Sequence, residues 1–288
     1  MGMMLFFTLS LLAAGIFLSR SIFGVDAVAN RDVLNHFDTN PAALNAMRLI
    51  QILSSIGAFL IPALVFPKAL RQWPSQFNRS SMIPSWQVLL TGILLMILAT
   101  PFTSWIIQWN QDVHLPASMT EIEQKLRASE NLAEQLTNAF VKADSTGIFL
   151  LNLFIVGILP AICEEFFFRG ALMRFLMMCI RNKHIAIALT AFVFSAIHGQ
   201  FFGFIARFVL GLLLGYIAYY CNSIWPAVLA HFFNNALALA AKHYQWDQSS
   251  LSILREDYVF PLYIVILSLG LTLFLLYRMK LKSQTLSN

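Results

Sequence analysis

Charged residues are too few in this chain to cover the surface of a protein that folds in water. Asp, Glu, Lys and Arg make up 11% of the 288 residues, and hydrophobic residues make up 58%. Soluble globular domains carry roughly 25% charged residues, more than twice this content. The composition therefore excludes a water-soluble globular fold and predicts an integral, multi-pass membrane protein.

Apolar runs long enough to cross a bilayer as helices, about 20 residues each, recur along the whole chain. We therefore expect an all-α fold: one integral membrane domain over residues 1–288, a bundle of about eight transmembrane helices with a polar site inside. The first run is interpreted as a span rather than a signal peptide, because no Lys or Arg precedes it. The predicted spans are residues 3–23, 43–66, 85–107, 146–163 with a continuation to 180, 184–199, 203–221, 224–241 and 258–277.

Basic residues in the loops indicate how the bundle is oriented. With eight spans, three basic loops fall on one side of the membrane, and loops rich in Lys and Arg face the cytoplasm. Both termini are therefore predicted to be cytoplasmic, at the plasma (inner) membrane if the source is bacterial. Because orientation accounts for the net charge of +5, we expect no nucleic-acid partner. The basic loop residues are Lys68, Arg71, Arg79, Arg181, Lys183, Arg278, Lys280 and Lys282.

Residues 109–145 are predicted to form an extramembrane loop that contains an amphipathic helix. The helix is expected over residues 119–143, "MTEIEQKLRASENLAEQLTNAFVKA", where apolar side chains recur at helical spacing. A mostly polar helix with one apolar face is typical of a helix lying on a membrane surface. We interpret it as such a helix rather than as a catalytic or ligand-binding element. The apolar positions are Ile122, Leu126, Leu132, Leu136 and Phe140.

Two adjacent acids and an arginine interrupt one of the most apolar segments, in "EEFFFR" at residues 164–169. Ionisable residues inside spans usually face the bundle interior or a water-filled cavity, and they mark function. Glu165 and Arg169 lie four residues apart with the acid first, which favours an ion pair along one helix. Glu164 is rotated by about 100° from Glu165, so we expect it to point elsewhere as an unpaired carboxylate.

Two histidines and an asparagine supply the other polar groups of interest. His198 ends "FSAIH" at 194–198 in the fifth predicted span, and His231 and Asn235 bound "HFFNN" in the seventh. A desolvated carboxylate can act as a general base for water, and imidazole and amide groups can donate to an oxyanion. The sequence contains neither a GxSxG nor an HExxH motif. This inventory favours amide hydrolysis by an activated water molecule.

The three stretches also match a family pattern in the order EExxxR, FxxxH and HxxxN. Each motif is weak alone, but all three in order, each inside an apolar run, form a specific signal. Over about residues 150–240 the chain resembles the CaaX protease and bacteriocin-processing (CPBP) family of intramembrane proteases. That family includes the Ras-converting CaaX endopeptidases, and a bundle of eight spans suits it.

The resemblance implies a catalytic core over residues 146–241. Glu164 would activate water with assistance from His198, while His231 and Asn235 would stabilise the oxyanion. Glu165 and Arg169 would support the site. No cofactor is favoured. The resemblance leaves a zinc alternative open, in which Glu164, His198 and His231 would be the ligands and water would take the fourth position.

The function expected from the resemblance is an intramembrane endopeptidase that hydrolyses a peptide bond of a membrane-associated protein or peptide. Its partners would be membrane lipid and a peptide or lipidated protein substrate. Two alternatives stay open: a non-catalytic membrane scaffold or bacteriocin-immunity protein of the same fold, and a proton-coupled transporter, since buried Glu and His also serve proton relays.

Two features of the sequence leave the geometry of this site open. His198 falls near the outer end of its predicted span, whereas Glu164 and His231 fall nearer the middle of theirs. The run 146–180 is too long for one upright span. Either Pro160 breaks or kinks it, or a single helix is tilted and extends past the membrane.

Overall fold

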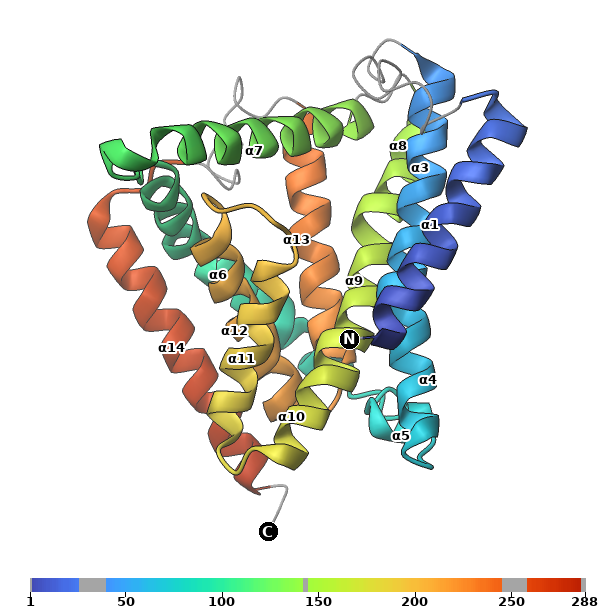
Figure 1. The fold of residues 1–288 in the computed structure, drawn as a ribbon. Coiled ribbons are helices and arrows are strands. Elements are labelled where there is room, and N and C mark those ends of the chain that lie inside the picture. Colours follow the sequence, from blue (N-terminus) through green and yellow to red (C-terminus); the bar gives the residue numbers. More distant parts are fainter. Residues whose placement is uncertain (1, 26–39, 142–144, 245–257, 286–288) are drawn as a thin grey trace.

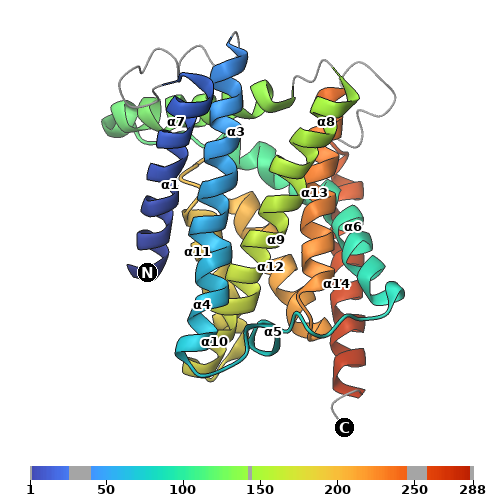
Figure 2. The same ribbon diagram turned by 90° about the vertical axis from the view of Figure 1, so that its right-hand side faces the viewer.

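The computed structural model describes residues 2–25, 40–141, 145–244 and 258–285, and all regular structure within these ranges is helical. Most helices run up and down in a bundle, and α7 (Thr120–Val141) lies across one end of it (Figures 1 and 2). The predictions of an all-α fold and of a helix over most of 119–143 are confirmed, and residues 142–143 of that segment lie outside the described ranges.

The other elements have the following bounds. They are α1 (Gly2–Phe23), α3 (Pro41–Ser55), η1 (Ile56–Leu60), α4 (Ile61–Ala69), α5 (Pro74–Phe77), α6 (Trp86–Gln111), η2 (Ala117–Met119), α8 (Thr146–Asn152), η3 (Leu153–Ile158), α9 (Leu159–Glu165), η4 (Phe166–Leu172), α10 (Met173–Cys179), α11 (Lys183–Ala196), α12 (Phe204–Cys221), α13 (Trp225–His243) and α14 (Leu262–Thr285).

Six helices in the described ranges are long and apolar enough to cross a membrane, which identifies the chain as a multi-pass membrane protein. They correspond to the first, second, third, fourth, sixth and eighth predicted spans. Of the two remaining predicted spans, α11 has 14 residues and is apolar but short, and α13 has 19 residues and carries several polar side chains. The count of eight therefore stays a prediction.

A single helical run from Thr146 to Cys179 carries the two adjacent acids. Its 34 residues exceed the roughly 20 needed to cross a bilayer upright, so the helix has to tilt or extend past the membrane. Pro160 does not break it. Two π-helical segments, η3 and η4, flank α9, and η3 ends just before Pro160. A π-helical segment shifts the hydrogen-bond pattern locally, which lets the helix pass a residue that has no N–H.

Close helix contacts at glycines hold the centre of the bundle together. A Cβ atom on Gly215 would lie 2.8 Å from the side chain of Ile187, and one on Gly211 would lie 3.0 Å from Ala191 Cβ. Both glycines therefore let α12 approach α11, as small residues do in membrane helix pairs. In the same way Gly92 on α6 lies against the carbonyl of Pro226 on α13. These contacts bring the helices of the candidate site within reach of one another.

Candidate active site

Glu165 and Arg169 form an ion pair buried in the bundle. Arg169 Nη1 donates to Glu165 Oε1 at 2.7 Å, and both side chains are 0% exposed. Arg169 Nη2 also donates to the carbonyl oxygen of Gly211 on α12, at 2.9 Å. The ion pair predicted from the spacing is present. Because a buried charge is stable only when it is paired and hydrogen-bonded, this pair fixes α9 and η4 against α12.

The same oxygen of Glu165 contacts a third group. His231 on α13 places Nδ1 2.9 Å from Glu165 Oε1, and the histidine is 4% exposed. A carboxylate oxygen can only accept, so Nδ1 carries the proton and donates. This contact fixes the orientation of the imidazole and directs Nε2 away from Glu165, as the aspartate of a catalytic triad does for its histidine.

Glu164 lies on the other side of the same imidazole. Its Oε2 is 4.0 Å from His231 Nε2, and its side chain is 13% exposed. Among the described residues, His231 is the one Lys, Arg or His side chain with a nitrogen within 4.0 Å of this carboxylate. The two adjacent acids therefore have different environments. Glu165 is held by an arginine, and Glu164 faces an imidazole across a gap that one water molecule can bridge.

A cavity of about 230 Å³ opens beside His231. It lies between α6, α12 and α13 and reaches the loop after α11. His198, His231 and Asn235 all line it, so three of the four predicted catalytic residues share one cavity. Glu164 is not among its lining residues and is connected to it through His231. The polar and charged lining residues are Thr100, Thr103, His198, Arg207, His231, Asn234 and Asn235.

His198 lies just beyond the end of α11, in the loop that leads to α12. Its Nδ1 donates to the carbonyl oxygen of Phe194 at 2.7 Å, and the Phe194 ring lies 5.0 Å from the imidazole. In a neutral ring this contact leaves Nε2 as a hydrogen-bond acceptor. Phe194 and His198 are four residues apart and lie on one face, and the histidine offers a lone pair to the cavity.

The depth of His198 relative to the acids follows from the turn between α10 and α11. The number of residues from Glu164 to the end of α10 equals the number from the start of α11 to His198. At about 1.5 Å per residue, both lie roughly 22 Å from that turn. His198 is near the end of its own helix because α11 is short. Its position therefore agrees with that of Glu164 on the longer neighbouring helix.

Asn235 faces the cavity and also contacts the helix that carries the acids. Its Nδ2 lies 3.4 Å from the carbonyl oxygen of Val156. Val156 lies four residues before Pro160, so a regular α-helix would leave this carbonyl without its N–H partner. The side-chain amide supplies a donor there. An asparagine amide has two N–H groups, so Asn235 can make this contact and still present a donor to the cavity.

The described residues do not fit the zinc alternative. Within the described ranges, no three His, Cys, Asp or Glu side chains are grouped closely enough to hold a metal ion. Glu164 Oε2 lies 4.0 Å from His231 Nε2, which is longer than the roughly 3.3 Å between two ligand atoms that bind one tetrahedral zinc ion. We therefore derive no step through a metal.

Two features of the site were not predicted from the sequence. The contact between Glu165 and His231 joins residues 66 positions apart, and no local spacing indicates it. Arg207 lines the cavity and donates to Gln200 Oε1, and it was not among the predicted site residues. A charged residue inside a predicted span was the signal available for Arg207.

Comparison with known proteins agrees with the motifs. Residues 146–237 match the family model described as "Type II CAAX prenyl endopeptidase Rce1-like". No curated protein and no solved structure matches the chain. The matched segment contains α8 to α12 and the part of α13 that carries His231 and Asn235. The resemblance to the CaaX protease and bacteriocin-processing family is thus confirmed over residues 146–237, the Rce1-like segment of this membrane protein.

Proposed function

We propose that this chain is an intramembrane endopeptidase that hydrolyses a peptide bond with water activated by Glu164. One observation carries the proposal. His231 lies between two carboxylates, with Nδ1 2.9 Å from Glu165 and Nε2 4.0 Å from Glu164, beside a cavity inside a membrane bundle. The match of this segment to an endopeptidase family supports the choice of a peptide bond as the substrate.

Glu164 would take a proton from the attacking water. Its carboxylate has no arginine or lysine partner within 4.0 Å among the described residues, so its lone pairs are available. A water molecule between Glu164 and His231 would be oriented by both groups. General-base catalysis of this kind contributes about 10²- to 10⁴-fold in rate, and the same carboxyl group can then return the proton to the leaving amine.

His231 and Asn235 would stabilise the oxyanion that forms as the carbonyl is attacked. Glu165 holds the imidazole in one orientation, so a protonated His231 presents Nε2–H without reorganisation. Preorganised donors of this type supply a large part of catalysis in water-poor sites. His198, which keeps Nε2 free as an acceptor in its neutral form, would assist by orienting water from the other side of the cavity.

The substrate would be a membrane-associated peptide or lipidated protein that reaches the cavity from the bilayer. The family name refers to CAAX prenyl endopeptidases, and we extend that chemistry to this chain as part of the proposal. Membrane lipid would be the second partner, and no nucleic acid would bind. Following the basic loops, both termini would be cytoplasmic, at the plasma (inner) membrane if the source is bacterial, with α7 on the opposite side.

The test compares Glu164→Gln with the wild-type protein in lipid vesicles. Fluorogenic peptides ending in a CaaX sequence, with and without a prenyl group, report cleavage. Glu164→Gln keeps the size of the side chain and removes the base, so kcat should fall by about 10²- to 10⁴-fold. Glu121→Gln, in an exposed pair with Lys125, is the control and should cleave normally. Cleavage by Glu164→Gln at the wild-type rate contradicts the proposal.

We further propose that the reaction needs no bound metal, because the donor groups around His231 do not form a zinc site. Removal of zinc and other divalent ions by a strong chelator should leave peptide cleavage unchanged. Elemental analysis of the purified protein provides the independent measurement. A stoichiometric zinc ion whose removal abolishes cleavage would overturn this part of the proposal.

A further inference from the structure

His198 is the one proposed catalytic residue that does not lie within a helix. It belongs to the loop of residues 197–203 between α11 and α12, and Gly199 next to it has φ +65°, in the left-handed region. Loop residues are held less firmly than helical ones. The hydrogen bond from His198 to the Phe194 carbonyl on α11 holds the imidazole at one point, and a histidine that has to orient a water molecule also needs the rest of its loop to be fixed.

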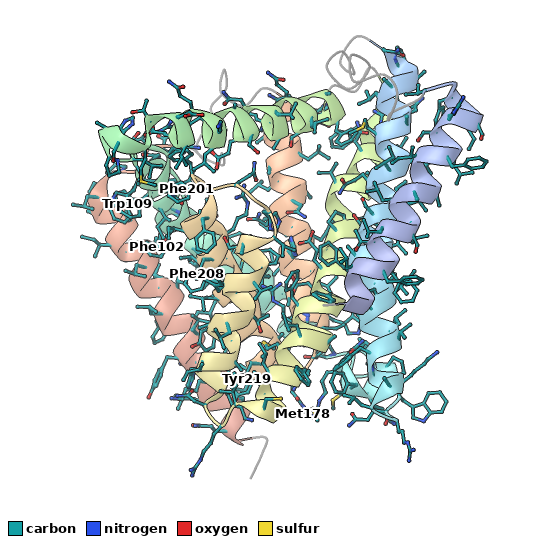
Figure 3. The ribbon with its side chains drawn as sticks, viewed as in Figure 1. Phe102, Trp109, Met178, Phe201, Phe208 and Tyr219 are labelled. Atoms are coloured by element: carbon teal, nitrogen blue, oxygen red, sulfur yellow. The ribbon has the colours of Figure 1, made fainter. Side chains whose placement is uncertain are left out.

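The amphipathic helix α7 makes direct contact with this loop. Glu130 Oε1 accepts a hydrogen bond from the backbone N–H of Phe202 at 2.6 Å. One turn earlier on α7, the Arg127 guanidinium lies 4.0 Å from the centre of the Phe202 ring. Phe202 is 1% exposed, and the neighbouring Phe201 lies just below α7 (Figure 3). A charged acceptor and a cation over an aromatic ring therefore act on the same loop residue.

α7 is itself anchored at its N-terminal half. Glu123 accepts from the backbone N–H of Leu115 at 2.8 Å and pairs with Arg127 Nη2 at 2.8 Å. Arg127 also donates to the carbonyl oxygen of Val113 at 3.0 Å. These contacts tie the start of the helix to the segment that follows α6. Arg127 thus joins the anchor of α7 to the aromatic ring of the loop.

The C-terminal end of α7 is attached to the opposite side of the bundle. The carbonyl oxygen of Phe140 accepts from the Asn152 side chain on α8, and Asn152 Oδ1 accepts from Arg48 Nε on α3 at 3.0 Å. In the last turn of α7, Asn138 Oδ1 accepts from Lys242 on α13 at 3.1 Å. The helix therefore spans from α6 to α3 across one end of the bundle (Figure 1) and cannot shift freely.

Other hydrogen bonds hold the loop and the start of α12, and they come from α6, α11 and α12. Ser195 Oγ donates to the carbonyl oxygen of Phe204 at 2.6 Å, and Ile205 N–H donates to Asn110 Oδ1 at 2.9 Å. Within the loop, His198 Nδ1 donates to the carbonyl oxygen of Phe194 at 2.7 Å, Arg207 donates to Gln200 Oε1, and Asn110 Nδ2 donates to the carbonyl oxygen of Phe201 at 3.5 Å. The bond from Phe202 to Glu130 adds a support from α7 to those from the bundle helices.

We propose that Glu130 is a positioning residue for His198: by holding Phe202, α7 sets the position of the catalytic histidine. The inference rests on the proposed function, since it assigns to α7 a part in the same reaction. It replaces our interpretation of this helix as a surface element without a role at the site. Glu130 does not line the cavity and acts through the loop.

The test uses full-length protein in lipid vesicles and compares Glu130→Ala with Glu130→Gln. Gln keeps a carbonyl oxygen that can accept from Phe202 N–H, so it should retain most activity. Ala removes the acceptor, and we expect kcat to fall by about 10- to 100-fold with KM nearly unchanged, as displacement of a catalytic group does. Glu121→Ala, on the same helix with a surface partner only, is the matched control and should cleave like the wild type.

A double variant shows whether Glu130 acts through His198. If it does, adding Glu130→Ala to His198→Ala should lower kcat no further, because the two residues act as one unit. A full additional loss in the double variant would overturn the inference, and so would unchanged kcat in Glu130→Ala.

Hydrogen exchange separates this inference from the proposed function, because it needs no substrate. The Phe202 amide should exchange faster in Glu130→Ala than in the wild type, and at the wild-type rate in Glu121→Ala. Equal exchange of the Phe202 amide in Glu130→Ala and in the wild type would show that Glu130 does not hold the loop. Failure of the proposed function would give a different result, namely peptide cleavage by Glu164→Gln at the wild-type rate.

Discussion

The variant Glu165→Gln separates the two roles that we assign to Glu165, which pairs with Arg169 and orients His231. The substitution keeps the size of the side chain and one acceptor oxygen, so it creates no cavity. It removes the negative charge that faces Arg169 Nη1 at 2.7 Å and His231 Nδ1 at 2.9 Å. Arg169 is 0% exposed and would retain only uncharged acceptors, the carbonyl of Gly211 and the amide oxygen of the new side chain.

The size of the effect follows from this burial. Removal of one partner of a buried ion pair costs about 3–5 kcal/mol, because the other charge stays buried without compensation. We therefore expect the free energy of unfolding of Glu165→Gln to fall by about 3–5 kcal/mol. The double variant Glu165→Gln with Arg169→Met removes both charges and should recover most of this loss, since apolar side chains of similar volume often replace a buried pair without cost.

Unfolding in detergent, followed by circular dichroism during titration with a denaturing detergent, measures the stability of the three proteins. Peptide cleavage measures activity in parallel. The double variant should stay inactive although it is stable, because His231 has lost the carboxylate that orients it. Wild-type stability of Glu165→Gln would show that Arg169 does not depend on this charge, and wild-type cleavage by the stable double variant would show that His231 does not depend on it.

Two further predictions concern helix packing and the anchor of α7. Gly92→Ala places a Cβ atom 2.5 Å from the carbonyl oxygen of Pro226, so it should destabilise the protein by about 1–3 kcal/mol. Gly270→Ala is the control, because a Cβ there meets nothing within 4 Å, and it should leave the stability unchanged. Equal thermal unfolding of the two variants would show that the close contact at Gly92 does not matter for stability. The hydrogen bond from Leu115 N–H, followed by those from Arg127 and His114, lowers the pKa of Glu123 from 4.5 to about 2. The contacts of Glu123 with Leu115, Arg127 and His114 should therefore be intact above pH 4.5 and be lost as the pH falls towards 2. A carboxyl ¹³C NMR titration of Glu123 measures this, and a midpoint near 4.5 would show that these contacts are absent.

The local part of the site could be predicted from the sequence because helical spacing determines it. Glu165 and Arg169 are four apart on one helix, and their ion pair is present as expected. Phe194 and His198 are also four apart, and their rings pack together. The class of the fold followed from the scarcity of charge. Each of these predictions depends only on residues close in sequence or on composition.

The contacts between distant segments could not be predicted, since no short-range pattern encodes them. Spacing along α9 indicates that Glu164 and Glu165 point in different directions, but it does not indicate which helix each one meets. The attachment of Phe202 to Glu130 crosses 72 positions. The apolar face of α7 suggested only a helix on a surface, because the polar residues that bind the loop also suit solvent exposure. Helix packing, rather than periodicity, decides these contacts.

The geometry of one imidazole, that of His231, explains why Glu164 and Glu165 have different roles. A ring with nitrogens on opposite sides can face two carboxylates only if they approach from different directions, and adjacent helix positions are rotated by about 100°. Glu165 meets Nδ1 and is balanced by Arg169, while Glu164 meets Nε2. The cluster of four side chains is then neutral when Glu164 and His231 share one proton. A buried carboxylate and imidazole that share a proton avoid an uncompensated charge in the bundle. They also form the pair that can take a proton from water and pass it to a leaving amine, which is why we assign the reaction to Glu164 rather than to its neighbour.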